Sequence, residues 1–103
     1  MFPTRQTADH RRAELRLPVD AGATVRHRGQ VLTARVEDVS RGGAALRAAV
    51  PPPRDAPVTL EMGEMAIAAR VAWTAGRRFG VSFEQRLRAT DVFLVCRQSR
   101  SRL

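Results

Sequence analysis

The segment VEDVSRGGAAL, residues 36–46, places an acid, a hydroxyl and two glycines close together inside a run that is otherwise largely apolar. Asp38 and Ser40 stand two residues apart, so both side chains point to the same side of an extended backbone. Gly42 and Gly43 follow, and because they have no side chains they let a ligand approach the backbone closely. The sequence therefore predicts a corner of hydrogen-bonding groups beside open backbone.

Arginines precede this corner in the segment RRAELR. Arg11 and Arg12 are adjacent and Arg16 follows, so a bent segment can place all three around one ligand. A guanidinium makes bidentate contacts with phosphate oxygens or with the O6 and N7 edge of guanine, and its flat face stacks on a base. A carboxylate such as that of Asp38 accepts the paired N–H donors of guanine. Together the two segments indicate a clamp for a ligand that contains phosphate and guanine. The alternative is that the arginine segment and the DVSRGG corner are unrelated.

The length and the charge of the chain limit the number of domains and the kind of partner. The 103 residues suffice for one domain with one modest core. The formal net charge of +8 points to a polyanionic partner. However, all 18 basic residues are arginine and the chain has neither lysine nor asparagine, a bias typical of a GC-rich genome. Solvated surface arginines explain the charge equally well.

The cysteine content and hydropathy indicate the compartment. Cys96 is the only cysteine and lies in the apolar run DVFLVC, which fits a packing role in a reducing environment. The N-terminus has no apolar core of a signal peptide, and no apolar stretch is long enough to span a bilayer. We expect a cytoplasmic protein without membrane insertion.

Alternating apolar residues predict six short antiparallel strands that close into a small all-β barrel. Two strands flank a turn at RHRG, and Val36 and Val39 are out of phase, so a bulge is expected near Glu37 and Asp38. The remaining strands are expected in AALRAAV, Val58–Met62, Met65–Trp73 and Phe79–Phe83, and the proline-rich PPPRDAP is a loop.

The tail changes to a helical period. Its expected apolar face consists of Leu87, Val92, Phe93, Val95 and Cys96, with Thr90 or Asp91 as the N-cap. The predicted organisation is a flexible N-terminal arm over residues 1–16, a β-barrel over 17–85, and a C-terminal helix with a basic tail over 86–103.

The two motifs resemble those of the PilZ domain, a family of bacterial receptors for cyclic di-GMP (c-di-GMP). The arginine motif RxxxR, often RRxxxR, reads RRAELR here, and the [D/N]xSxxG motif reads DVSRGG from Asp38 to Gly43. Each pattern alone is weak, but their order, their spacing and the β-rich chain that follows make the pair specific. The stretch ARVAWTAGRRFGVSFEQ also resembles the closing hairpin of the family, so the similarity extends from Arg11 to the terminal helix.

The resemblance implies a role for each motif residue. Arg12 and Arg16 would grip phosphates and guanine edges, and Arg11 would add a further contact. Asp38 and Ser40 would read a guanine. Gly43 would permit the turn, and Gly42 would help the backbone come close. Members bind either one ligand molecule or an intercalated pair, and an arginine before RxxxR, as Arg11 is, favours the pair.

Trp73 ends the longest predicted strand beside a hairpin, where its indole can stack on an exposed base. Its phase with Val71 makes packing in the core an equal alternative. No cofactor is expected besides the ligand c-di-GMP.

The resemblance implies a receptor that relays its signal in trans to an effector protein, with motility or biofilm formation as the family's usual outputs. Three other functions fit the sequence less well. Catalysis has little support, because His10 and His27 lie in the arm and a turn without a metal-binding cluster, and Ser40 has no histidine nearby in sequence. Binding of DNA or RNA predicts low base specificity and a steep loss of affinity with salt, whereas the arm and the DxSxxG corner predict saturable, guanine-specific binding of a small ligand. The main alternative is an adaptor that binds a protein and no nucleotide.

Overall fold

The computed structural model describes residues 15–98. Arg11 and Arg12, with the rest of the expected arm before Leu15, lie outside the described residues. The described residues form six strands and a helix, in the order β1 (Leu17–His27), β2 (Gln30–Val39), β3 (Gly43–Ala48), β4 (Pro57–Met62), β5 (Met65–Ala75), β6 (Arg78–Phe83) and α2 (Ala89–Arg97).

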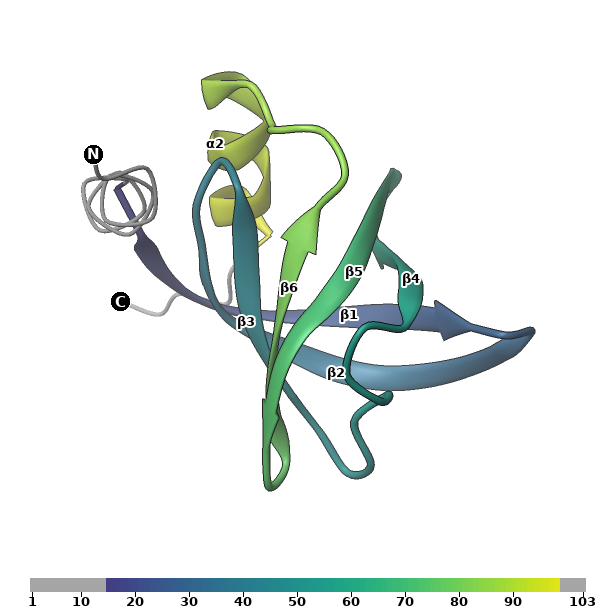
Figure 1. The fold of residues 1–103 in the computed structure, drawn as a ribbon. Coiled ribbons are helices and arrows are strands. Elements are labelled where there is room, and N and C mark those ends of the chain that lie inside the picture. Colours follow the sequence, from purple (N-terminus) through teal and green to yellow (C-terminus); the bar gives the residue numbers. More distant parts are fainter. Residues whose placement is uncertain (1–14, 99–103) are drawn as a thin grey trace, which may run out of the picture.

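The strands form a closed antiparallel barrel in the spatial order β1-β2-β3-β6-β5-β4 (Figure 1), which confirms the predicted fold class. The turn between β1 and β2 consists of Arg28 and Gly29, both with positive φ, as a two-residue hairpin turn of the I′ kind requires. Closure depends on a short pairing of β1 with β4, where Thr24–Arg26 face Thr59–Glu61.

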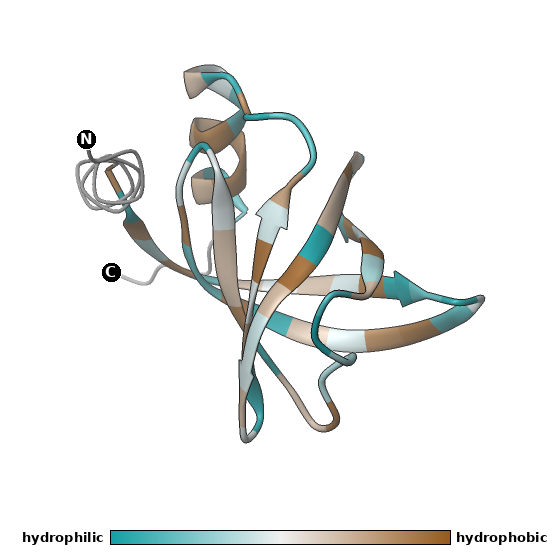
Figure 2. Cartoon of the chain, in the orientation of Figure 1, coloured by the Kyte–Doolittle hydropathy of each residue, from teal (hydrophilic) through white to brown (hydrophobic). Residues whose placement is uncertain are grey.

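The barrel interior is filled by apolar side chains from every strand. Hydrophobic and hydrophilic residues alternate along the strands (Figure 2), so one face of each strand is buried and the other meets solvent. The largest fully buried apolar side chains are Phe79, Leu46, Leu60, Met62, Val25, Val36, Val39, Val71 and Val95. Burial of such a side chain contributes about 1.5–3 kcal/mol, so this interior fixes which residues must face outward.

Within residues 15–98, β-bulges break the alternation at three places. One lies in β2 between Val36 and Asp38, as predicted, and allows both Val36 and Val39 to point inward. A second lies in β5 between Val71 and Trp73, and a third in β1 between Pro18 and Ala21. The bulge in β5 was not expected, and it moves Trp73 out of phase with the buried Val71.

The helix α2 follows β6 and lies at one end of the barrel, near the β2–β3 turn (Figure 1). Val92 and Val95 pack into the core, and Cys96 packs against it. Phe93 was expected on this buried face but is 62% exposed, because it lies one position outside the stripe that meets the barrel.

The N-cap of the helix is Arg88, two or three residues earlier than predicted. Leu87, which was expected on the apolar face of the helix, is buried just ahead of it. Asp91 occupies the third helical position, and its Oδ2 accepts a hydrogen bond from the backbone N–H of Arg88 at 3.2 Å. The assignment of Thr90 or Asp91 as the N-cap was therefore wrong, because the acid acts as the reciprocal half of a capping box. No helix within residues 15–98 is both long and apolar enough to cross a membrane.

Candidate functional site on the outer face of the barrel

The turn between β2 and β3 is made by the motif residues Ser40–Gly43. The backbone N–H of Ser40 donates to the Gly43 carbonyl at 2.8 Å, and the Ser40 hydroxyl donates to the same oxygen at 3.4 Å. The hydroxyl also accepts from the backbone N–H of Gly42 at 3.3 Å. Ser40 is only 1% exposed. Whereas the sequence predicts a hydroxyl facing the ligand beside Asp38, β2 ends at Val39 and the Ser40 hydroxyl bonds within the turn.

Gly43 and Arg41 connect this turn to the rest of the barrel. A Cβ on Gly43 would collide with the backbone carbonyl oxygen of Val81 on β6, so only glycine allows this strand approach. Arg41 exchanges two contacts with Leu87: its carbonyl accepts the Leu87 N–H, and its Nε donates to the Leu87 carbonyl, both at 2.8 Å. The motif turn is thus tied to the segment that leads into α2.

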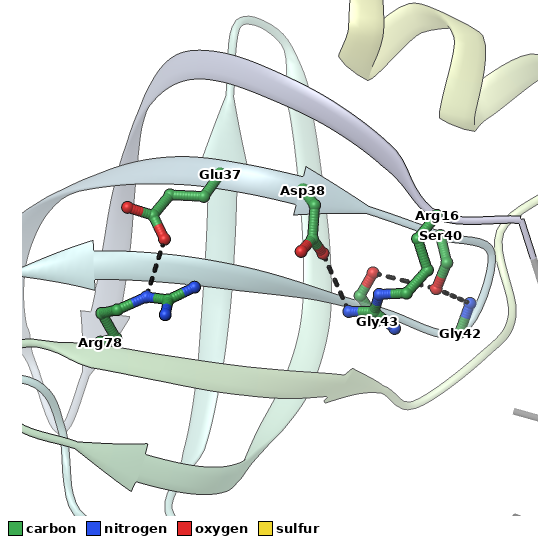
Figure 3. A network of polar contacts seen from close by, with 7 residues as sticks. All are labelled: Arg16, Glu37, Asp38, Ser40, Gly42, Gly43 and Arg78. Carbon is green, nitrogen blue, oxygen red and sulfur yellow. Dashed lines mark hydrogen bonds and ion pairs between the residues drawn. The ribbon is translucent and has the colours of Figure 1, made fainter. Parts of the chain in front are cut away.

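Asp38 lies on the outer face at the end of β2 and pairs with the one arginine of the RRxxxR motif that the structure describes. The Nη2 of Arg16 donates to Asp38 Oδ1 at 2.8 Å (Figure 3). The side chains are 44% and 30% exposed, so water competes for the contact. An ion pair with this exposure contributes at most about 1 kcal/mol. The fold therefore brings the two sequence motifs into direct but weak contact.

Trp73 lies on the outer face of β5, 41% exposed, and its indole rests against Gly80 of β6. Nε1, Cε2 and Cδ1 of the indole occupy the space that a Cβ on Gly80 would need. The five-membered ring therefore lies directly over the β6 backbone. Of the two alternatives left open by the sequence, packing in the core does not occur, and the indole is placed where one side meets solvent.

These residues share one transverse row across four neighbouring strands. Asp38 of β2 pairs with Ala45 of β3, Ala45 pairs with Gly80 of β6, and Gly80 pairs with Trp73 of β5. Ala45 faces outward and is not part of the core cluster, although only 3% of it is exposed. We call these four residues the site row. It has a carboxylate at one end, an aromatic ring at the other and small residues between them.

Glu37 precedes Asp38 in the same bulge and also has its carboxylate at the outer face (Figure 3). Its Oε2 accepts from Arg47 Nε at 2.9 Å, and its Oε1 accepts from Arg78 Nε at 3.0 Å. The hydrogen bond from Arg47, followed by that from Arg78 and their positive charges, lowers the pKa of Glu37, although partial burial acts in the opposite direction. This carboxylate therefore stays charged below the pH at which an ordinary glutamate is protonated.

The structure brings Arg16, Asp38 and the Ser40–Gly43 turn together at one end of the site row, with Trp73 at the other end. The sequence did not point to Ala45, Gly80, Glu37, Arg47 or Arg78. A usable signal existed for Gly80, since a glycine inside an alternating strand marks a close approach by another group. Within residues 15–98, no group of three or more metal-binding side chains is present.

These features define a class of domain: a small closed antiparallel β-barrel with polar motifs on an outer face and one helix at its end. The family model for the PilZ domain matches residues 10–96. The chain therefore belongs to the PilZ domain family.

A solved structure supports the same fold. The crystal structure of the Borreliella burgdorferi PlzA protein in complex with c-di-GMP matches with a TM-score of 0.69 at 14% sequence identity. The match covers 89% of this chain and 42% of that chain, so this chain spans less than half the length of that protein. No curated protein matches the sequence.

Proposed function

We propose that this domain is a bacterial second-messenger receptor that binds c-di-GMP at the outer end of β2 and passes the signal in trans to an effector protein. The observation that carries the proposal is the 2.8 Å contact between Arg16 and Asp38, which joins the arginine motif to the DxSxxG motif. Membership in the PilZ family and the fold shared with a c-di-GMP-bound protein support this choice of ligand.

Binding exchanges one weak ion pair for several stronger contacts. The Asp38 carboxylate can accept the two N–H donors of a guanine edge, which releases the Arg16 guanidinium for a phosphate or for O6 and N7 of guanine. Because the two side chains are partly exposed, separating them costs little. In the proposal, Arg11 and Arg12 complete the clamp from the chain segment ahead of Arg16.

The turn residues and Trp73 have distinct parts in this proposal. Ser40 contributes through the shape of the turn, because its hydroxyl is bonded within it. Gly42 and Gly43 keep the turn free of side chains beside the ligand, and Trp73 offers a face on which a guanine stacks. A second, intercalated ligand molecule would extend the stack onto Arg11.

The signal leaves the site through the turn itself. Arg41 lies inside the motif and holds the backbone of Leu87 just before α2, so a shift of the turn is transmitted to the start of the helix. An effector in the bacterial cytoplasm, of the kind that controls motility or biofilm formation, would sense this change together with the neutralised arginines.

Calorimetric titration with c-di-GMP, with GTP and cyclic di-AMP as controls and at two salt concentrations, tests the proposal. We expect saturable binding of c-di-GMP alone. Arg16→Ala should lower the affinity by about tenfold or more, since a charge-assisted contact contributes about 1.5–3 kcal/mol. Asp38→Ala should weaken binding and reduce the discrimination of guanine from adenine.

The matched control is Arg26→Ala, because Arg26 forms a similarly exposed 2.8 Å ion pair with Glu61 on β4, remote from the motifs. Its affinity should equal that of the unmodified chain. If the folded chain binds no c-di-GMP, the receptor proposal is wrong, and the adaptor that binds only a protein takes its place.

A further inference from the structure

Three arginines occupy neighbouring positions across the barrel, next to the site row. Arg35 of β2 pairs with Arg47 of β3, and Arg47 pairs with Arg78 of β6. Like charges directly opposite each other on neighbouring strands are destabilising. A surface selected for stability alone would not favour three in succession, so this arginine row needs a physical reason.

Carboxylates compensate the arginine row only in part. Arg35 Nε pairs with Asp20 Oδ1 at 2.5 Å, whereas the single carboxylate of Glu37 pairs with both Arg47 and Arg78. The two hydrogen bonds to Glu37 use the Nε atoms and do not involve the terminal nitrogens of either guanidinium. Arg47 and Arg78 are 52% and 49% exposed. They form a pair of accessible cations, and the Glu37 carboxylate holds the Nε of each.

The position of this pair relates it to the site row. Arg47 lies two residues after Ala45, and Arg78 lies two residues before Gly80, all on the outer face. Two residues along a strand span about 6.6 Å, the distance between neighbouring side chains on one face. A nucleotide that lies on the site row between Asp38 and Trp73 would therefore have Arg47 and Arg78 along one edge.

We propose that Arg47 and Arg78, positioned by Glu37, form an anion-binding subsite that contacts a phosphate group of the nucleotide bound on the site row. The inference rests on the proposed c-di-GMP site and extends it across β3 and β6. The bulge in β2 is central to it, because it puts two successive carboxylates at the outer face. Asp38 belongs to the site row, and Glu37 holds the two arginines beside that row.

The first experiment measures c-di-GMP affinity of the full chain and of the variant Arg47→Ala/Arg78→Ala. The loss of two charge-assisted contacts should weaken binding by about tenfold or more. Arg26→Ala, which removes an exposed cation on the opposite side of the barrel, serves as the control and should change the affinity less than about twofold. An unchanged affinity in the double variant would overturn the subsite.

The role of Glu37 is tested by repeating the double substitution in a Glu37→Gln background. If Glu37 positions the arginines, the fold-change caused by their removal is smaller in this background, because unfixed side chains contribute less. A Glu61→Gln background should leave the fold-change as it is in the unmodified chain. Equal fold-changes in the Glu37→Gln and unmodified backgrounds would refute the positioning role.

A second readout separates the subsite from the proposed function. Nε–Hε resonances of Arg47 and Arg78 in ¹⁵N spectra, assigned from single substitutions, should shift with c-di-GMP while that of Arg26 stays in place. Inorganic pyrophosphate is titrated in parallel. If c-di-GMP fails to bind but pyrophosphate shifts both resonances saturably, the nucleotide proposal is wrong and the anion subsite stands. If c-di-GMP binds without shifting them, the receptor stands and the subsite is wrong.

Discussion

The two ends of the site row are each set by a β-bulge, and the two bulges differ in how they are encoded. In β2 the extra residue falls between Val36 and Asp38, and the apolar pattern resumes out of phase at Val39. In β5 the extra residue falls between Val71 and Trp73, close to the end of the strand, and no later residue of β5 is buried. One bulge therefore leaves a mark in the hydropathy pattern, and the other leaves none.

The direction in which a strand residue points can therefore be inferred from the sequence only where buried residues lie on both sides of a bulge. Trp73 is apolar and appears in phase with Val71, yet the bulge places it outside. Both bulges have the same structural effect, since each delivers a side chain to the outer face that regular alternation would not. The bulge in β2 places the Asp38 carboxylate at one end of the site row, and the bulge in β5 places the Trp73 indole at the other.

The largest expected effect of a substitution is on stability, at the two glycines close to the ends of the site row, Gly43 and Gly80. A Cβ on Gly43 would meet the Val81 backbone, which cannot move away, whereas a Cβ on Gly80 would meet the Trp73 indole, which can swing outward. We expect Gly43→Ala to lower the free energy of unfolding by about 3 kcal/mol and Gly80→Ala by about 1 kcal/mol. Urea unfolding measures both changes.

Gly22→Ala is the control, because only Arg35 Nη1, at 3.9 Å, would approach its added Cβ. It should be neutral or stabilising by up to about 1 kcal/mol. Trp73 is the only tryptophan, so its fluorescence reports the indole position directly. The emission of Gly80→Ala should shift to longer wavelength, and a loss of stability as large as that of Gly43→Ala would mean that the indole is fixed rather than movable.

The second effect concerns the aromatic end of the row. Trp73→Ala should lower the c-di-GMP affinity by about tenfold, since stacking of a base on an aromatic side chain contributes about 1–3 kcal/mol. Trp73→Phe should retain most of the affinity because it keeps a stacking face. Calorimetry of the two variants checks this expectation. If alanine and phenylalanine leave the affinity equally unchanged, the indole only covers Gly80.

The sequence predicted the six strands, the closed barrel and the bulge at Asp38 because buried apolar residues with a period of two record them directly. It could not place Ser40, whose buried hydroxyl depends on where β2 ends and on how the turn closes on Gly43. Phe93 was assigned to the wrong face of α2, since a short helix offers too few turns to define its buried stripe.

The cross-strand neighbours were the least accessible part of the prediction. Glu37, Arg47 and Arg78 are separated in the chain, and their meeting depends on the register of β2, β3 and β6. In a chain with 18 arginines, composition does not distinguish two functional guanidiniums from solvated ones. Only the structure shows which of them share a carboxylate.

The smallest expected effect is the pH dependence of the stability that Glu37 contributes through its contacts with Arg47 and Arg78, beside the bulge in β2. The hydrogen bond from Arg47 is the first cause that lowers the pKa of Glu37 below its usual value of 4.5. A carboxylate with a lowered pKa in the folded state stabilises the fold above pH 4.5, and this contribution disappears as the pH falls through the lowered pKa. Glu37→Gln should therefore be less stable than the unmodified chain at pH 7, and the difference in stability should be smaller at pH 3, below the usual pKa of 4.5.

Because both arginines are about half exposed, the gap at pH 7 should be no more than about 1 kcal/mol. Urea unfolding of both proteins at the two pH values measures it, and the difference between them removes the contribution of the other carboxylates. Glu61→Gln is the matched control, because the Glu61 carboxylate pairs with one arginine, Arg26, instead of two. A gap that is the same at pH 7 and pH 3 would show that the charge of Glu37 does not hold the arginines. The bulge in β2 would then serve only to present Asp38, as the bulge in β5 presents Trp73.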